Sequence, residues 1–211
     1  MKKKIIIVTG DPNSINSEII YKLWKKIDKS LKSRIYFISN ERLIKRQLYK
    51  LKFSLKTIKV KDIYTKTNSN KLKIIDLKLD FKDPFNVSFN AASKFVKSSL
   101  NLGHKIAQSR EVAGLINCAI DKKLLGSDKI GVTEYLARKC KVKKDEEVMV
   151  IRNKKLSVCP ITTHIDVREI SKKINSKIIV NKLKTIETWY KHKYKRKPKI
   201  GILGLNPHNA E

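Results

Sequence analysis

The sequence predicts an α/β protein with a mostly parallel sheet flanked by helices. Short continuous apolar runs, typical of strands buried on both faces, recur along the chain. Runs with apolar residues three or four positions apart, typical of helices packed on a sheet, alternate with them. The 211 residues, 41% of them hydrophobic and 32% charged, can form a sizeable core. No apolar run approaches the ~20 residues that a membrane-spanning helix needs.

The first half of the chain begins with KIIIVTG, whose apolar run ending in glycine predicts a buried strand. Two amphipathic helices follow, and Ser17 and Asn40 are their expected N-caps. A polar segment, TKTNSN, then separates two β-like runs. The next helix is long, with Phe89 and Phe95 expected on its apolar side. The predicted strands are 4–10, 34–39, 53–60 and 73–79, and the predicted helices are 17–27, 40–51 and 88–108.

The second half continues the alternation. VAGLINC predicts a further buried strand, and two β-rich runs joined at RNKK predict a hairpin. Asp166 is expected to start a helix, and a longer amphipathic helix follows it. The predicted elements are strands at 112–118 and 199–205, a hairpin at 147–164, and helices at 132–140, 166–174 and 176–194. No internal repeat or low-complexity segment occurs, so we expect no clear internal linker.

Cysteine content and charge limit the possible environments and partners. The three cysteines are widely spaced and form no CxxC pair, which disfavours a disulfide framework and is consistent with a cytoplasmic protein. The net charge of +30 makes nucleic acid an obvious candidate partner. However, only eight of the 49 basic residues are arginine, and lysine is spread along the whole chain. The densest basic run, 191–199, either contacts a phosphate backbone or ends a helix before Pro198.

Two histidines follow predicted strands, at the positions where open α/β sheets bind ligands. His164 ends CPITTH, and His208 lies in GLNPHNAE just after the last predicted strand. They are either half of a metal site or two unrelated surface residues, and no short zinc signature has their spacing. His104 and His192 lie on predicted helices and are expected to be solvated. The first strand is followed by neither G-x-G-x-x-G nor a P-loop, so the common nucleotide cradles are absent.

Five segments, taken together, resemble the 4-hydroxythreonine-4-phosphate dehydrogenase family. The segment ending in TTH and the segment GLNPHNAE resemble the family's T-T-H and G-L-N-P-H-x-G-E motifs, which are specific. The other three resemble its T-x-G-[DE]-P-x-G-I-G-P-E, T-x-P-I-N-K and G-H-T-E-x-x-A motifs, and all five occur in the family's order. The corresponding stretches are VTGDPNSINSEI (8–19), NCAIDKKLL (117–125), IGVTEYLA (130–137), EEVMVIRNKKLSVCPITTHIDVREISKKI (146–174) and KIGILGLNPHNAE (199–211).

The resemblance implies a cytoplasmic homodimer of vitamin B6 (pyridoxal phosphate) synthesis, with a fold like that of isocitrate and isopropylmalate dehydrogenases. Such enzymes use NAD (or NADP) to oxidise 4-phosphohydroxy-L-threonine, and the product then loses carbon dioxide. Three histidines hold a divalent metal (Zn, Mg or Co) that binds the substrate. A metal on the hydroxyl oxygen favours hydride loss and stabilises the enolate that decarboxylation leaves.

Five residues of this chain match functional positions of the family. His164 and His208 match two metal ligands, and Thr133 matches a substrate-contacting threonine. Val132 stands where the family has a substrate-contacting histidine, and it offers neither a proton nor a hydrogen bond. Lys122 matches the lysine of P-I-N-K, so it is a candidate to meet a carboxylate or phosphate; the alternative is one more solvated lysine.

Other positions depart from the family's motifs. Ser14 and Asn16 replace glycines of the opening loop, so we expect that turn to be built differently. Asp11 and Glu18 match its acidic positions, although Asp11 equally suits a loop cap. The third metal histidine belongs to a family region that continues past N-P-H. The 211 residues are therefore expected to form the N-terminal portion of a two-lobed dehydrogenase, incomplete at the C-terminus, either as a fragment or as a short relative.

Two other functions remain open. A paralogue within the family would act on another phosphorylated hydroxy acid, such as a phosphothreonate or phosphoerythronate. A basic nucleic-acid-binding protein belongs to a different class, and its binding to random DNA would be strong and steeply salt-dependent. The dehydrogenase reading instead predicts only weak electrostatic adhesion to nucleic acid.

Overall fold

The computed structural model describes residues 3–65, 67, 70–126, 131–142, 146–163 and 165–206. The chain groups into two compact units, Met1–Lys139 and Cys140–Glu211. The sequence contains no low-complexity linker at this boundary.

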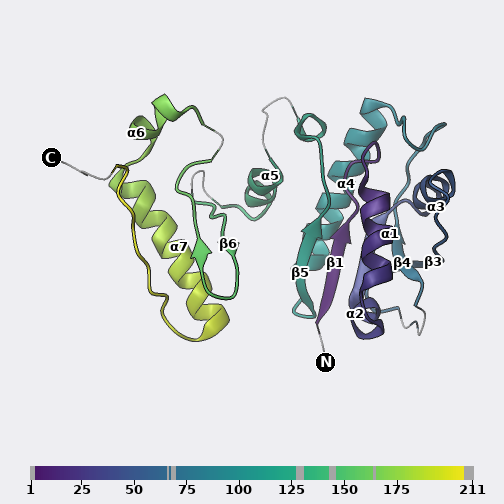
Figure 1. Ribbon diagram of the computed structural model, residues 1–211, viewed down its shortest axis with the longest axis horizontal. Helices are drawn as coiled ribbons and strands as arrows, with labels where there is room; N and C mark the ends of the chain where they lie inside the picture. Colours follow the sequence, from purple (N-terminus) through teal and green to yellow (C-terminus); the bar gives the residue numbers. More distant parts are fainter. Residues whose placement is uncertain are drawn as a thin grey trace. The chain divides into compact units, whose positions relative to one another are not determined.

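The first unit contains a five-stranded parallel sheet, which confirms the predicted fold class (Figure 1). The strand order is β3-β4-β2-β1-β5, so β1 lies between β2 and β5. The strands are β1 (Lys4–Val8), β2 (Ile35–Ser39), β3 (Thr57–Val60), β4 (Leu72–Asp76) and β5 (Val112–Asn117).

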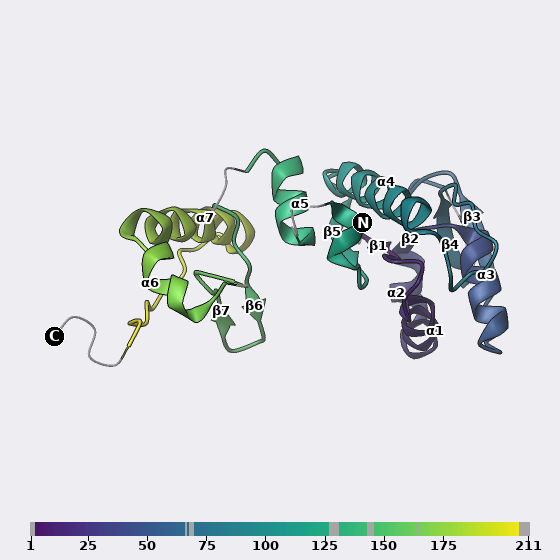
Figure 2. The same ribbon diagram turned by 90° about the horizontal axis from the view of Figure 1, so that it is seen from above.

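Helices cover the sheet on both faces (Figure 2). Helix α4 (Phe89–Ala107) packs on one face of the sheet, over Ile6 and Ile38. The residues next to these in the strands point to the opposite face. Helices α1 (Asn16–Lys26) and α3 (Glu41–Lys50) cover the opposite face, where Ile7 and Phe37 are buried. Burial on both faces explains why the central strands appear as continuous apolar runs in the sequence.

The predicted caps of the first two helices have different outcomes. Asn40 caps α3 as predicted, since its side-chain oxygen accepts a hydrogen bond of 2.8 Å from the Leu43 amide. Ser17 is not a cap: it lies inside α1, which begins at Asn16 after Ile15. A short helix that was not predicted, α2 (Lys29–Arg34), follows α1, and the Asp28 carboxylate caps it by accepting a hydrogen bond from the Leu31 amide.

Two predictions of burial in the first unit are wrong. Phe89, at the first position of α4, is 58% exposed, whereas Ala92 and Phe95, further along the helix, are buried. β5 is an edge strand, and most of its residues are exposed, although its sequence is as apolar as that of the buried strands. The unit ends with the 3₁₀ helix η1 (Lys122–Leu125) and helix α5 (Val132–Lys139), which pack against α4.

The second unit combines a short hairpin with helices. A short hairpin, β6 (Ile151–Arg152) with β7 (Ser157–Val158), lies at the predicted position and turns at Asn153–Leu156. Asp166 caps a 3₁₀ turn, η2 (Val167–Glu169), that leads into α6 (Ile170–Lys173). Helix α7 (Ser176–Tyr194) matches the predicted 176–194. No helix among the described residues is long and apolar enough to cross a membrane.

The strand predicted at 199–205 is absent. Residues 199–204 have no regular secondary structure, and no neighbouring strand pairs with them among the described residues. Ile202, Leu203 and Leu205 are 61%, 92% and 59% exposed, so the apolar side chains of this run are not buried. The β-type sequence is present, but a strand requires a pairing partner.

Candidate functional site

The carboxyl ends of β1 and β5 meet at a point where the direction of chain winding reverses. From β1 the chain proceeds to β2 on one side, whereas β5 returns on the other side of β1. The connection after β1 runs through α1, and the connection into β5 runs through α4 on the opposite face. Open α/β sheets bind ligands at such a switch point. We call the loops 9–16 and 117–123 at this place the carboxyl-edge site.

Asn16 joins the two loops of the carboxyl-edge site. Its side-chain amide donates hydrogen bonds to the carbonyl oxygens of Thr9 (2.9 Å) and Ala119 (2.8 Å), so it links the end of β1 to the end of β5. The Asp11 amide also donates to the Ala119 carbonyl, at 3.0 Å. Gly10 has φ of +75°, and a Cβ atom there would lie 2.4 Å from the Ala119 carbonyl oxygen. Only glycine allows these loops to approach so closely.

The opening loop is built without the two glycines of the family's motif, as expected. The Ser14 hydroxyl donates to the Asp11 carbonyl at 2.6 Å, and Gly10 alone has positive φ between residues 9 and 16. Asp11 acts as a loop cap, because its carboxylate accepts a hydrogen bond from the Asn13 amide at 2.8 Å. Glu18 pairs with Lys22 one helical turn later, at 2.6 Å. The acidic positions therefore have local structural roles.

Three candidate residues lie on adjacent elements beyond β5. Lys122 is exposed at the start of η1, where the Asp121 carboxylate caps the Lys123 amide. Thr133 is exposed in the first turn of α5, which packs beside η1. Val132 is partly buried and packs against the core under α4. Lys122 and Thr133 are thus available to an external ligand, whereas the Val132 side chain contributes to packing.

Burial affects two of the three cysteines. All three are free, and burial raises the pKa of the Cys118 thiol to about 11. Burial also raises the pKa of Cys159. The Cys118 thiol is therefore protonated at neutral pH.

The two histidines predicted as metal ligands, His164 and His208, lie outside the described residues. Within the described ranges, no group of three or more His, Cys, Asp or Glu side chains is arranged to hold a metal ion. His192 is exposed on α7, as predicted. His104, on α4, is only half exposed and lies 3.4 Å from the Gln108 amide. The metal site therefore remains a prediction from the motifs.

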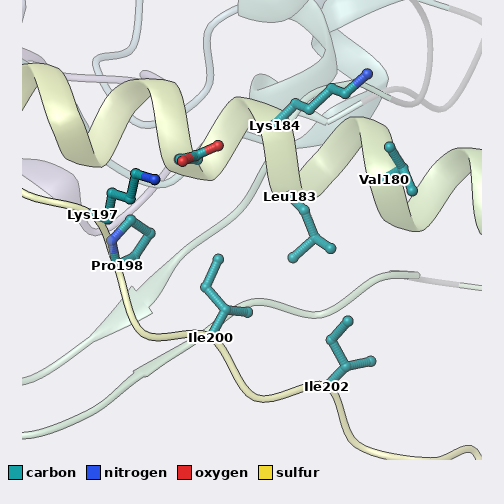
Figure 3. A pocket seen from close by; sticks show the side chains of 8 residues that line it. Val180, Leu183, Lys184, Lys197, Pro198, Ile200 and Ile202 are labelled. Atoms are coloured by element: carbon teal, nitrogen blue, oxygen red, sulfur yellow. The ribbon is translucent and has the colours of Figure 1, made fainter.

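The second unit contains an open groove of about 420 Å³ between α7 and the segment that follows it (Figure 3). Leu183, Ile200 and Ile202 point toward one another across it. The groove is lined by Val180, Leu183, Lys184, Glu187, Lys197, Pro198, Ile200 and Ile202. Its one carboxylate, Glu187, is paired with Lys191 at 2.7 Å, so the groove offers no cluster of metal ligands or catalytic acids.

The dense basic run ends a helix. α7 stops at Tyr194, and Lys195 adopts the left-handed conformation of a C-cap with φ of +57°. Cations of the run lie over the rings of α7: Lys193 is 5.7 Å from the Trp189 ring centroid, and Arg196 is 6.0 Å from that of Tyr190. The basic run thus has a structural role at the end of helix α7. This is the second of the two roles that the sequence allowed for it, the first being contact with a phosphate backbone.

Sequence reasoning missed the supporting residues of the carboxyl-edge site. Gln47, buried on α3, donates from its amide to the carbonyls of Pro12 and Pro84, both at 2.7 Å. Asn13 exchanges two hydrogen bonds of 2.8 Å with the backbone of Val87. An asparagine in a turn normally bonds its own neighbours, so the sequence carried no signal for contacts across more than 70 positions.

Comparisons with known proteins identify the family. The sequence model described as "Pyridoxal phosphate biosynthetic protein PdxA" matches residues 30–211. The 4-hydroxythreonine-4-phosphate dehydrogenase of Sulfurihydrogenibium sp. (strain YO3AOP1) is 32% identical over 99% of this chain and 64% of its own length. That of Aquifex aeolicus (strain VF5) is 28% identical over all of this chain and 65% of its own.

The structural comparison agrees. The crystal structure of a 4-hydroxythreonine-4-phosphate dehydrogenase from Burkholderia phymatum has a TM-score of 0.80 and 25% identity, with 99% of this chain and 64% of that chain covered. The chain thus spans somewhat less than two thirds of the length of these relatives. On the family match and this common fold, the chain belongs to the PdxA family of pyridoxal phosphate biosynthetic proteins.

Proposed function

We propose that the protein oxidises 4-phosphohydroxy-L-threonine with NAD in pyridoxal phosphate synthesis, and that the oxidised product then loses carbon dioxide. NADP is the alternative hydride acceptor. The proposal is supported by the family match and by relatives named 4-hydroxythreonine-4-phosphate dehydrogenase. We also propose that the protein works as a homodimer in the cytoplasm, as the resemblance implies.

The observation that carries the proposal is the carboxyl-edge site at the switch point. Lys122 is exposed in the second of its loops, and Thr133 is exposed on α5, which packs beside η1. The Lys122 ammonium would pair with the carboxylate or phosphate of the substrate, and the Thr133 hydroxyl would hydrogen-bond to it. The amino end of α5 would add a partial positive charge beside the anionic substrate.

We propose that His164 and His208 are two ligands of a divalent metal ion. Neutral imidazoles suit zinc and similar ions and leave positions for a substrate to bind. When bound, such an ion would acidify the substrate hydroxyl and stabilise the charge that develops after hydride loss. The roles of the chain's own residues are to hold that ion and to bind the anionic groups of the substrate.

Formation of NADH tests the proposal. The assay compares residues 1–211 with a chimera. In the chimera, the part of the Sulfurihydrogenibium relative that the match does not cover is joined to residues 1–211, in the order that it has in the relative. We expect metal-dependent NADH formation by the chimera and far slower turnover by residues 1–211, because two imidazoles alone hold an ion loosely. Comparable turnover by both would mean that residues 1–211 complete the site by themselves.

Matched variants of the chimera test the two substrate contacts. Lys122→Met and Thr133→Val should each raise KM by about tenfold or more, as expected for the loss of about 1.4 kcal/mol of binding free energy. Lys123→Met is the control, because Lys123 is an equally exposed lysine at the next position. An equal effect of Lys122→Met and Lys123→Met would show that only overall charge matters.

Two residues within the family's motif stretches leave the identity of the substrate undecided. Val132 replaces a histidine and Cys118 lies in the T-x-P-I-N-K stretch, so a phosphothreonate or phosphoerythronate is the alternative substrate. The chimera should be assayed with all three compounds, and a higher kcat/KM for either alternative would reassign the activity within the family. Binding to random DNA should be weak; tight binding that falls steeply with salt would favour the nucleic-acid reading.

A further inference from the structure

The segment that carries Lys122 is held to the rest of the first unit on both sides of the lysine. Before Lys122, the Ala119 carbonyl accepts the 2.8 Å hydrogen bond from the Asn16 side chain. After it, the Leu124 carbonyl accepts a hydrogen bond of 2.8 Å from the Ser93 hydroxyl on α4, and the Leu124 side chain is buried. Lys122 therefore lies between one attachment to the loop after β1 and another to α4.

Between these two attachments the backbone is held only by the local bonds of a 3₁₀ turn. The Asp121 carboxylate accepts a hydrogen bond of 3.0 Å from the Lys123 amide, and the Asp121 carbonyl accepts one of 3.0 Å from the Leu124 amide. Such local bonds fix the shape of η1 but not its place beside the sheet. That place depends on the attachments at Ala119 and Leu124.

The Asn16 amide can join the two loops in one orientation only. Its nitrogen bonds to the carbonyl oxygens of Thr9 and Ala119, and a flipped amide would place its own oxygen against them, with no hydrogen to share. In this orientation the Asn16 Oδ1 atom is buried and has no hydrogen-bond partner among the described residues. A buried unsatisfied acceptor is unfavourable, so packing alone does not favour an asparagine here. The two donated bonds are the contribution of this side chain.

Asn16 stands where the family's opening motif has a glycine. A glycine has no side chain and cannot donate to the Ala119 carbonyl. Of the two hydrogen bonds that this carbonyl accepts in the described part of the chain, only the one from the Asp11 amide, at 3.0 Å, would then remain. The bond from Asn16 is therefore an addition in this chain, and the family's motif does not predict it.

We propose that Asn16 is a positioning residue for Lys122, because it holds the loop 117–123 in the place from which the Lys122 ammonium binds the anionic group of the substrate. The inference rests on the proposed contact between Lys122 and the substrate. Asn16 itself is 3% exposed and acts through the lysine. A loop that is already held in place loses less conformational freedom on binding, so the substrate binds more tightly.

A double-mutant cycle in the chimera described above tests whether Asn16 acts through Lys122. Asn16→Ala should raise KM at least about threefold while Lys122 is present, with kcat little changed, because the lost interaction is one of binding. In a Lys122→Met background the same substitution should leave KM unchanged. Asn16→Gly, which restores the family's residue, should behave like Asn16→Ala and provides a second variant if the alanine variant does not fold.

Asn40→Ala is the matched control. Asn40 is also a buried asparagine that joins two segments, since it accepts a hydrogen bond of 2.8 Å from the Leu43 amide and donates one of 2.7 Å to the Leu77 carbonyl. It lies at the end of β2, outside both loops of the carboxyl-edge site. Its removal should lower the free energy of unfolding without changing KM in either background.

Hydrogen exchange in residues 1–211 gives a second readout that requires no activity. The Asp11 amide bonds to the Ala119 carbonyl, and the Leu124 amide reports opening of η1. Asn16→Ala should speed exchange at both amides by at least about tenfold, because the two loops then separate more readily. Asn40→Ala should leave both rates unchanged.

The two readouts separate failure of this inference from failure of the proposed function. An equal rise of KM in the Lys122 and Lys122→Met backgrounds would mean that Asn16 acts only through general stability, which would overturn the proposal. Unchanged exchange at both amides in Asn16→Ala would also overturn it. If the chimera forms no NADH, or if Lys122→Met alone leaves KM unchanged, the proposed activity or contact is wrong. The exchange rates then decide by themselves whether Asn16 holds the loop that carries Lys122.

Discussion

Replacing Gly10 by alanine should destabilise the first unit by about 2–4 kcal/mol. An alanine with φ of +75° costs about 1–2 kcal/mol. Its Cβ atom would lie 2.4 Å from the Ala119 carbonyl oxygen and 2.8 Å from the Asn16 side-chain nitrogen. These are the atoms of the hydrogen bond that joins the loops, so that bond must lengthen or break, at about 1 kcal/mol or more.

Alanine substitutions at two other glycines distinguish the cost of backbone strain from the cost of the close contact. Gly126 has φ of +147° and open space around its Cα, so Gly126→Ala measures backbone strain alone, about 1–3 kcal/mol. Gly114 has neither a positive φ nor a close neighbour, and Gly114→Ala should be neutral or slightly stabilising. The expected order of destabilisation is Gly10→Ala, then Gly126→Ala, then Gly114→Ala.

Urea unfolding followed by tryptophan fluorescence measures these differences. The assay uses a Trp189→Phe background, so that the signal comes only from Trp24, which is 3% exposed in the first unit. Midpoints convert to free energies of unfolding if the slope is unchanged among the variants. If Gly10→Ala costs no more than Gly126→Ala, the close approach of the two loops is not a determinant of stability.

The remaining predictions concern three other positions. Asn16→Ala should lower the free energy of unfolding by about 1–3 kcal/mol in the same assay, because it removes the two hydrogen bonds that join the loops and leaves only the Asp11 amide as a donor to the Ala119 carbonyl; no loss would contradict the proposed link. Burial lowers the pKa of Lys73 from its ordinary 10.5 to about 8. Between these two pKa values the unfolded chain binds more protons than the folded chain. The free energy of unfolding, measured relative to that of Lys73→Met, should therefore rise with pH by about 1–3 kcal/mol. Urea unfolding from pH 7 to 10.5 measures this difference, and a difference that does not change with pH would refute the prediction. Tyr135→Phe removes the 2.9 Å bond from its hydroxyl to Asn101 and should cost about 0.5–1.5 kcal/mol, measured by urea unfolding; a larger loss would mean that α5 depends on it more than this contact explains.

Local patterns predicted most of the elements. The continuous apolar runs of β1 and β2 and the periodicity of α4 and α7 were sufficient, because burial dictates those patterns directly. Burial itself was not predictable for β5. Its apolar sequence resembles that of a central strand, and its edge position depends on strand order, which local patterns do not encode.

The site was predicted from motifs, and its supporting contacts were not. The motifs made Lys122 and Thr133 candidates, and the structure shows both exposed on neighbouring elements, while their contact with a substrate stays a prediction. The role of Asn16 could not be predicted, because its two acceptors lie 7 and 103 positions away. The strand predicted at 199–205 is absent because β propensity forms a strand only where another strand can pair with it.

The most direct test of the central claim, that this chain holds a catalytic metal through the two motif histidines, is calorimetric titration of residues 1–211 with zinc. We expect His164→Ala and His208→Ala each to weaken zinc binding by about tenfold or more, with unchanged unfolding in metal-free buffer. His192→Ala is the matched control, because His192 is an exposed histidine on α7 outside both motifs, and its removal should leave the affinity unchanged. Equal losses from all three substitutions, or none from His164→Ala and His208→Ala, would contradict the claim.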